Sequence, residues 1–189
     1  MVNYFYVCSK EEEEYSDTFR GLHCVEGDRN NLVAQVTDSR DFCKDERAIS
    51  YEYFLQSIKK DTILYIKSDS GNVLGCCSIC INSLDYISIY GICVPDRGIK
   101  GIGTALIDKL KELSNRLGLT SINLSAEQSA QTFYLKNGFT IRNNDMYDDD
   151  DMYDGYSMMT YTSLKRGKKT KSYKKIRKGK NKKRSRKKV

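Results

Sequence analysis

The sequence YISIYGICVPDRGIKGIGT, residues 86–104, is the most informative stretch of this chain. Its first part is an apolar run that ends at Pro95, the only proline, and its second part places Gly101 and Gly103 in a short turn. Beyond the turn, apolar residues recur at helical spacing as far as Gly118, a residue type that commonly ends helices. The pattern predicts a strand, a glycine-rich turn and an amphipathic helix, in that order.

The glycine-rich turn at the start of a helix is suited to binding an anion. Glycines let a ligand approach the backbone closely, and the first N–H groups of a helix point toward a pyrophosphate placed there. The spacing alone is equally compatible with a tight turn used only for helix packing. A Walker A loop is excluded because no lysine stands between Gly103 and Thr104. A Rossmann fingerprint is excluded because the turn follows an antiparallel meander near the middle of the domain.

Apolar periodicity predicts the elements on both sides of this turn. The expected strands cover residues 2–8, 62–67, 73–81, 86–94, 121–125, 139–141 and 156–163. The expected helices cover residues 46–60, 102–117 and 128–137, and residues 17–45 show no strong periodicity. The strand, turn, helix and strand around Pro95 form one βαβ crossover, and the three strands before it form a meander.

Charge divides the chain into two parts. Residues 165–189 carry 16 Lys or Arg and no acid, whereas the other 164 residues carry 16 bases against 25 acids. A segment so basic and so poor in apolar residues cannot offset its ordering entropy, which predicts a domain over residues 1–164 and a disordered basic tail. Residues 145–154 hold six acids, and such a block predicts a mobile loop.

The seven cysteines, an odd number mostly among apolar neighbours, favour reduced thiols over a disulfide framework. With no apolar run long enough to span a bilayer and no secretory signal, this predicts an intracellular protein of the cytoplasm or nucleus, with no membrane partner. Cys76, Cys77 and Cys80 resemble half of a zinc site, but the only histidine is His23, far upstream. We therefore expect no metal and assign these cysteines to a strand.

Two blocks of sequence resemble the GNAT superfamily of acyl-CoA-dependent N-acetyltransferases. The family pattern x-Pro-x-x-(Gln/Arg)-x-x-Gly-x-(Gly/Ala), preceded by a strand, is matched in register by Cys93, Pro95, Gly101 and Gly103. The second block is matched by Ala130, Phe133, Tyr134, Lys136, Asn137, Gly138 and Phe139. The chain departs from the family at three places: Gly98 replaces the Gln/Arg, Glu127 replaces a frequent asparagine, and Ile87 stands where some members carry a glutamate base.

The resemblance implies an α/β (α+β) fold of the GNAT type, a mixed, mostly antiparallel twisted sheet flanked by helices. It implies an N-acetyltransferase that moves an acetyl group from acetyl-CoA, as co-substrate, to a primary amine of a small molecule or peptide by direct attack. The implied cofactor-binding residues are Cys93, Val94, Ile99, Lys100, Gly101, Ile102, Gly103 and Thr104. Tyr134 takes the place of the general acid, the alternative being a half-buried helix aromatic. Asp85 is either a base acting through water or a turn residue.

A second hypothesis starts from the basic tail. Residues 165–189 would bind nucleic acid without sequence preference, and the acetyltransferase fold would be weakly active or inactive. Solubilisation or nuclear targeting is the alternative for the tail. The acidic residues 145–154 would suit a cationic acceptor such as a lysine-rich peptide or polyamine, or the basic tail of the same chain or of a second protomer in a homodimer.

Overall fold

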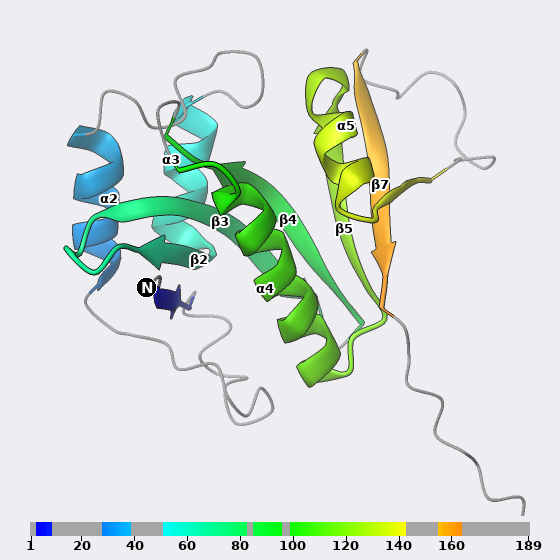
Figure 1. Cartoon of the computed structure of the whole chain (residues 1–189), viewed down its shortest axis with the longest axis horizontal. Helices are drawn as coiled ribbons and strands as arrows, with labels where there is room; N and C mark the ends of the chain where they lie inside the picture. Colours follow the sequence, from blue (N-terminus) through cyan, green and yellow to red (C-terminus); the bar gives the residue numbers. More distant parts are fainter. Residues whose placement is uncertain are drawn as a thin grey trace, which may run out of the picture.

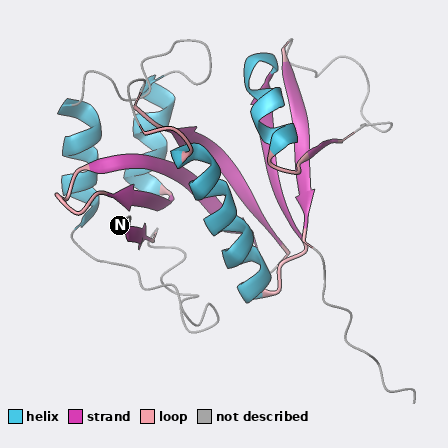
Figure 2. Ribbon diagram, viewed as in Figure 1, coloured by secondary structure: helices cyan, strands magenta, loops and turns pink. Residues whose placement is uncertain are grey.

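The computed structural model describes residues 3–8, 28–38, 51–82, 85–95, 99–142 and 155–163. The expectations for Arg97 and Gly98, for the acidic residues 145–154 and for the tail 165–189 fall outside these ranges. Within them, a seven-stranded sheet carries helices on both faces (Figures 1 and 2).

The sheet has the mixed, mostly antiparallel order expected from the sequence. In spatial order its strands are β1 (Asn3–Val7), β2 (Thr62–Lys67), β3 (Val73–Asn82), β4 (Tyr86–Cys93), β5 (Ser121–Glu127), β7 (Tyr156–Thr162) and β6 (Thr140–Ile141). Only β4 and β5 are parallel among these neighbours, and α4 (Ile102–Leu117) connects them. The predicted meander and βαβ crossover are both confirmed.

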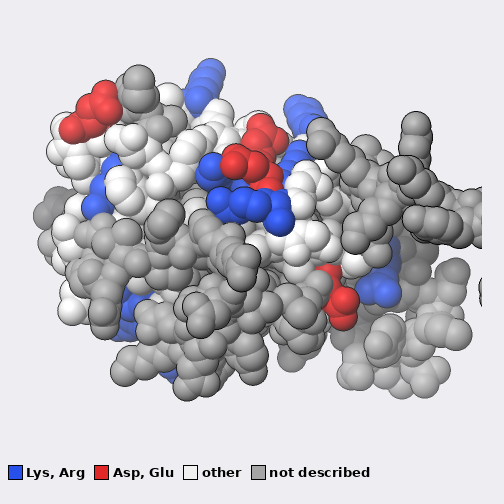
Figure 3. Space-filling model, turned by 90° about the horizontal axis from the view of Figure 1, so that it is seen from below, with Lys and Arg blue, Asp and Glu red and all other residues white. Residues whose placement is uncertain are grey.

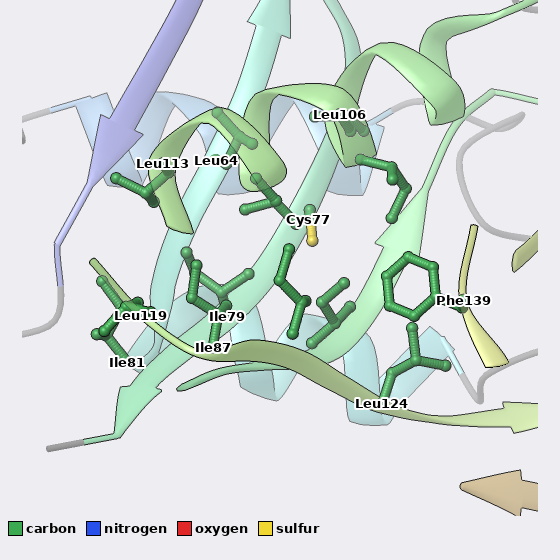
Figure 4. Packing of buried hydrophobic residues seen from close by; sticks show 14 of the residues in the cluster. Leu64, Cys77, Ile79, Ile81, Ile87, Leu106, Leu113, Leu119, Leu124 and Phe139 are labelled. Atoms are coloured by element: carbon green, nitrogen blue, oxygen red, sulfur yellow. The ribbon is translucent and has the colours of Figure 1, made fainter. Parts of the chain in front are cut away.

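Each face of the sheet has its own hydrophobic core. Strand β2 is apolar throughout, so Leu64 and Ile66 point to one face while Ile63 and Tyr65 point to the other, and all four are fully buried. The larger cluster includes α4 and receives aromatic residues of α5 (Gln128–Lys136) (Figure 4). The smaller cluster includes α2 (Asp28–Asp38) and α3 (Tyr51–Lys60). Strand β4 contributes buried residues to both clusters, so it is packed on both faces.

Helix α2 was not predicted, because its hydrophobic face is narrow. Only Leu32 and Val36, one turn apart, are buried in the core. The guanidinium of Arg29 supplies a second anchor: its Nη1 donates to the carbonyls of Ile58 and Asp61 at 2.9 and 2.8 Å, and its Nη2 donates to the carbonyl of Cys8 at 2.7 Å. One side chain thus joins α2, the end of α3 and the segment after β1.

We expect Arg29→Met to lower the free energy of unfolding by about 2 kcal/mol or more. The substitution removes charge-assisted hydrogen bonds and leaves partly buried carbonyls without that donor. Urea denaturation would measure the loss, with Lys59→Met, an exposed position on α3, as the control. Equal stability of the two variants would contradict this role for Arg29.

The cysteines require a correction. Cys8 and Cys93 each take part in a disulfide, whereas Cys76, Cys77 and Cys80 are free thiols. An odd number of cysteines excludes only the pairing of all of them, and the expectation of reduced thiols was wrong for Cys8 and Cys93. Among the described helices, none combines the length and the apolar character needed to cross a bilayer.

Candidate functional site

The parallel strands β4 and β5 separate part of the way along their length. Their register runs from Tyr86 opposite Ser121 to Ile89 opposite Leu124, although β4 continues to Cys93 and β5 to Glu127. Figure 1 shows the two strands diverging toward the ends at which α4 and α5 begin. Beyond Ile89 the two facing edges no longer pair with each other, which leaves strand edges available to an extended ligand.

A β-bulge accompanies this separation. Ser78 pairs with Gly91 and Ile79 with Ile89, so Tyr90 has no counterpart on β3. A bulge bends its strand and increases the local twist. Strand β4 follows β3 as far as Cys93, and β5 follows β7 over its whole length, so the sheet opens between them.

The opening forms a cavity of about 490 Å³, a size typical of small-ligand sites. It is lined by Ile92, Val94, Pro95, Ile99, Lys100, Gly101, Ile102, Gly103, Thr104, Ser125, Ala126, Glu127, Ala130, Phe133 and Tyr134. The structure therefore brings Tyr134 together with all the predicted cofactor-binding residues except Cys93. The side chain of Cys93 is buried in the α2/α3 cluster, because neighbouring strand residues point to opposite faces. Cofactor binding by the backbone of Cys93, which does not pair with β5, stays a prediction.

The N-terminus of α4 provides an anion site at one end of the cavity. Gly101 is the N-cap, with φ of 92°, and its carbonyl accepts the first helical bond from the Ala105 N–H at 2.9 Å. The N–H groups of Ile102, Gly103 and Thr104 precede that bond, so they are available to an acceptor in the cavity. The positive end of the helix dipole and the exposed Lys100 add favourable charge.

The two glycines of the turn have different roles. A Cβ on Gly101 would meet nothing within 4 Å, so glycine is required there for its left-handed backbone. A Cβ on Gly103 would lie 3.2 Å from the ring of Phe133 on α5. Gly103 therefore also allows α4 and α5 to pack closely. Helix packing was the alternative to anion binding as the reason for the glycine turn.

Gly75 on β3 is a further residue that shapes the cavity, and sequence reasoning did not single it out. A Cβ there would lie 2.6 Å from Ile102 Cγ2 and 3.1 Å from Val94 Cγ1, two residues that line the cavity. The available signal was an isolated glycine inside a strand pattern, which indicates close approach of another segment.

Tyr134 lies at the cavity wall, with its ring held by two aromatic neighbours. It makes edge-to-face contacts with Phe133 and Phe139, at centroid distances of 5.1 and 5.6 Å. Burial raises the pKa of the Tyr134 phenol well above its ordinary value. The group is therefore a phenol at neutral pH, able to donate a hydrogen bond or proton but unable to act as a base.

The carboxylates considered as bases are placed differently. Ile87, at the family's base position, is fully buried in the α4 core. Asp85 lies at the opposite end of β4, where its carbonyl accepts from the N–H and Oγ1 of Thr120, both at 2.7 Å. This position favours the interpretation of Asp85 as a turn residue over its interpretation as a base. Glu127 lines the cavity, and its Oε1 accepts from the Tyr156 hydroxyl at 3.0 Å.

The described ranges contain no group of three or more His, Cys, Asp or Glu side chains that could hold a metal ion. The ionisable side chains that line the cavity are Lys100, Glu127 and Tyr134.

Part of the chain matches a known protein family. The model of the acetyltransferase (GNAT) domain matches residues 59–141, which include β4, α4, β5 and α5 around the cavity. Residues 59–141 match the GNAT acetyltransferase domain. The family match covers both blocks on which the resemblance was based.

Solved structures with the GNAT fold resemble this domain. The catalytic domain of the Tetrahymena Gcn5 histone acetyltransferase, in complex with coenzyme A, aligns with a TM-score of 0.53 and 15% identity over 86% of this chain and 93% of its own. N-acetylglutamate synthase from Neisseria gonorrhoeae, complexed with coenzyme A and N-acetyl-glutamate, aligns with a TM-score of 0.51 and 13% identity over 86% of this chain and 35% of its own. At these identities the likeness shows the fold. No curated protein matched the sequence.

A third structure, a nourseothricin acetyltransferase, has 20% identity over 54% of this chain and a TM-score of 0.43. This chain covers 65% of that protein, slightly less than two thirds of its length.

Proposed function

We propose that this GNAT domain transfers the acetyl group of acetyl-CoA to a primary amine. The observation that carries the proposal is the separation of β4 from β5 beside the N-terminus of α4. An extended pantetheine arm, which contains amide groups, is suited to the free strand edges, and a pyrophosphate is suited to the N–H groups of Ile102, Gly103 and Thr104. The coenzyme A complexes of the two fold relatives support the same ligand class.

In the proposed reaction the amine nitrogen attacks the thioester carbonyl. A C–N bond forms, the C–S bond breaks, and the departing sulfur receives a proton from the Tyr134 hydroxyl. The amine loses its proton to solvent or to a base of the acceptor site, and the Tyr134 phenolate regains a proton from solvent before the next turnover. The apolar cavity walls at Ile92, Ala126 and Phe133 limit access of water to the thioester, so the domain acts mainly by orientation.

The test is incubation of the full chain with acetyl-CoA and a panel of primary amines, analysed by mass spectrometry. We expect an acetylated amine together with an equal amount of free CoA. If CoA binds but no amine in a panel of small amines and lysine peptides is acetylated, the proposal fails and the fold is a binding scaffold.

The nucleic-acid hypothesis gains no support from the described surface. Figure 3 shows basic and acidic side chains beside each other on the face that it presents, and α4 carries two mixed pairs, Lys109 with Glu112 and Lys111 with Asp108. Polyanion binding would depend on residues 165–189, which lie outside the described residues, so it stays a prediction.

We expect Gly75→Ala to weaken CoA binding about tenfold. The added Cβ displaces Ile102 and Val94, which line the cavity, and such overpacking also costs about 1–3 kcal/mol of stability. Calorimetric titration with CoA would measure the change. The control is Gly71→Ala in the β2–β3 turn, where alanine is disfavoured by a φ of 85° but no atom lies near the new Cβ. Equal CoA affinity in both variants would contradict the close-packing argument.

A further inference from the structure

The bulge in β4 presents Tyr90 on the face of the sheet opposite α4. Tyr90 lies two residues before Ile92, which lines the cavity, and 41% of its surface is exposed. Its hydroxyl interacts with Cys80 on β3, whose neighbours Ile79 and Ile81 belong to the α4 core. Because strand side chains alternate between faces, Cys80 and Tyr90 lie on the other face. Bulges beside active sites commonly redirect a side chain in this way.

Two further groups, Tyr53 and Asp61, act electrostatically on the Tyr90 phenol and therefore lie near it. Tyr53 of α3 is 52% exposed, and Asp61 stands between α3 and β2. Asp61 is held in place by the fully buried Ser78, whose Oγ donates to Oδ2 at 3.0 Å, and Ser78 pairs with Gly91, the residue after Tyr90. Partial burial, followed by the influence of Cys80, Asp61 and Tyr53, raises the pKa of Tyr90 to about 12, so its ring is neutral at physiological pH.

These three side chains have the chemistry of a cation site. Exposed tyrosine rings attract ammonium groups through their π faces, and a carboxylate adds a direct charge interaction. Within the described residues, Asp61 has no ion-pair partner. The Arg29 guanidinium binds the backbone carbonyl of Asp61 at 2.8 Å and not its carboxylate. The interaction that the structure gives the side-chain oxygens is with the neutral hydroxyl of Ser78, so the carboxylate keeps a face for a ligand cation.

The position of the site relative to the cavity determines which part of an acceptor it can hold. The Tyr90 side chain interacts with Cys80 on β3, and Asp61 directly precedes β2. The site therefore lies about one to two strand spacings, roughly 5–10 Å, from the opening between β4 and β5. An amine must be neutral to attack a thioester, and a cation site would keep it protonated. The group held here is therefore not the amine that reacts.

We propose that Tyr53, Asp61 and Tyr90 bind a second cationic group of the acceptor, which makes the acceptor a diamine, polyamine or similarly polycationic amine. This inference rests on the proposed acetyl transfer and names its substrate class. The donor occupies the α4 side of the opening, so the acceptor approaches from the opposite face, where these three side chains lie. Their contribution is to specificity and positioning, and bond formation does not involve them.

The test compares 1,4-diaminobutane with butylamine, which have the same reacting end and differ in the second charge. We expect kcat/KM for the diamine to exceed that for the monoamine about tenfold, mainly through KM. Tyr90→Leu and Asp61→Asn should each remove most of this preference without changing the rate with butylamine. Tyr86→Leu, at the other end of the same strand, is the matched control and should retain the preference.

A second readout does not depend on turnover. Tetramethylammonium, which cannot be acetylated, should bind the full chain more tightly than the neutral 2,2-dimethylpropan-1-ol, as followed by NMR titration, and Tyr90→Leu should abolish the difference. Equal binding of the two probes, or equal kcat/KM for the two amines in the parent protein, would overturn the inference. Loss of CoA binding or of all acetylation would instead overturn the proposed function, so the two failures are distinguishable.

Discussion

Tyr134→Phe is expected to lower kcat by about 100-fold or more while CoA affinity stays within about twofold. The variant keeps the ring that packs against Phe133 and Phe139 but removes the proton donor at the cavity wall. A loss confined to kcat is the sign of an interaction made only in the transition state. Steady-state kinetics with the best amine of the panel, together with CoA calorimetry, would measure both quantities.

The control for this variant is Tyr161→Phe. Tyr161 packs against Phe139 in the same core, at a centroid distance of 5.8 Å, but does not line the cavity. Its variant should retain the parental kcat. If Tyr134→Phe turned over as fast as Tyr161→Phe, Tyr134 would be a packing residue, the alternative that its sequence position left open.

Gly101→Val is expected to weaken CoA binding by tenfold or more, equivalent to at least about 1.4 kcal/mol. A β-branched residue is strongly disfavoured at φ of 92°, so the turn must rearrange and the N–H groups of Ile102–Thr104 lose their common direction. Isothermal titration calorimetry with CoA would measure the loss.

A matched variant at the other end of the same helix separates strain from ligand binding. Gly118 is also left-handed, with φ of 73°, but it lies at the C-terminus of α4. Gly118→Val should lower thermal stability by an amount similar to that for Gly101→Val and leave CoA affinity unchanged. Equal affinities in the two variants would place the anion elsewhere.

The elements best predicted from sequence are those defined by local signals. The polar turn after Lys67 predicted the β2–β3 hairpin, and the glycines at 101 and 118 predicted both ends of α4, because a positive φ at each end requires glycine. Two short sequence blocks likewise predicted the glycine turn, Tyr134 and most of the residues that line the cavity, because each block is a local signal.

The features that were missed depend on contacts between segments far apart in sequence. Helix α2 is anchored by the hydrogen bonds of Arg29 to other elements, and Gly75 matters because Ile102 packs against it. The side chain of Cys93 points away from the cavity because neighbouring residues of β4 face opposite sides of the sheet. This alternation could have been predicted from the sequence, but the family resemblance assigned the whole segment to the ligand. The bulge at Tyr90 is set by pairing with β3 and has no sequence signature of its own.

The most direct test of the central claim is a nitrogen–proton correlation spectrum of the full chain, labelled with ¹⁵N-glycine only and titrated with CoA. The chain has 13 glycines, so the spectrum is simple, and Gly103→Ala and Gly75→Ala would assign two of its signals. We expect the Gly103 amide, within the proposed pyrophosphate site, to shift most strongly downfield, while the Gly118 and Gly71 signals stay in place. Saturable CoA binding that leaves the Gly103 signal unmoved, or no CoA binding at all, would contradict it.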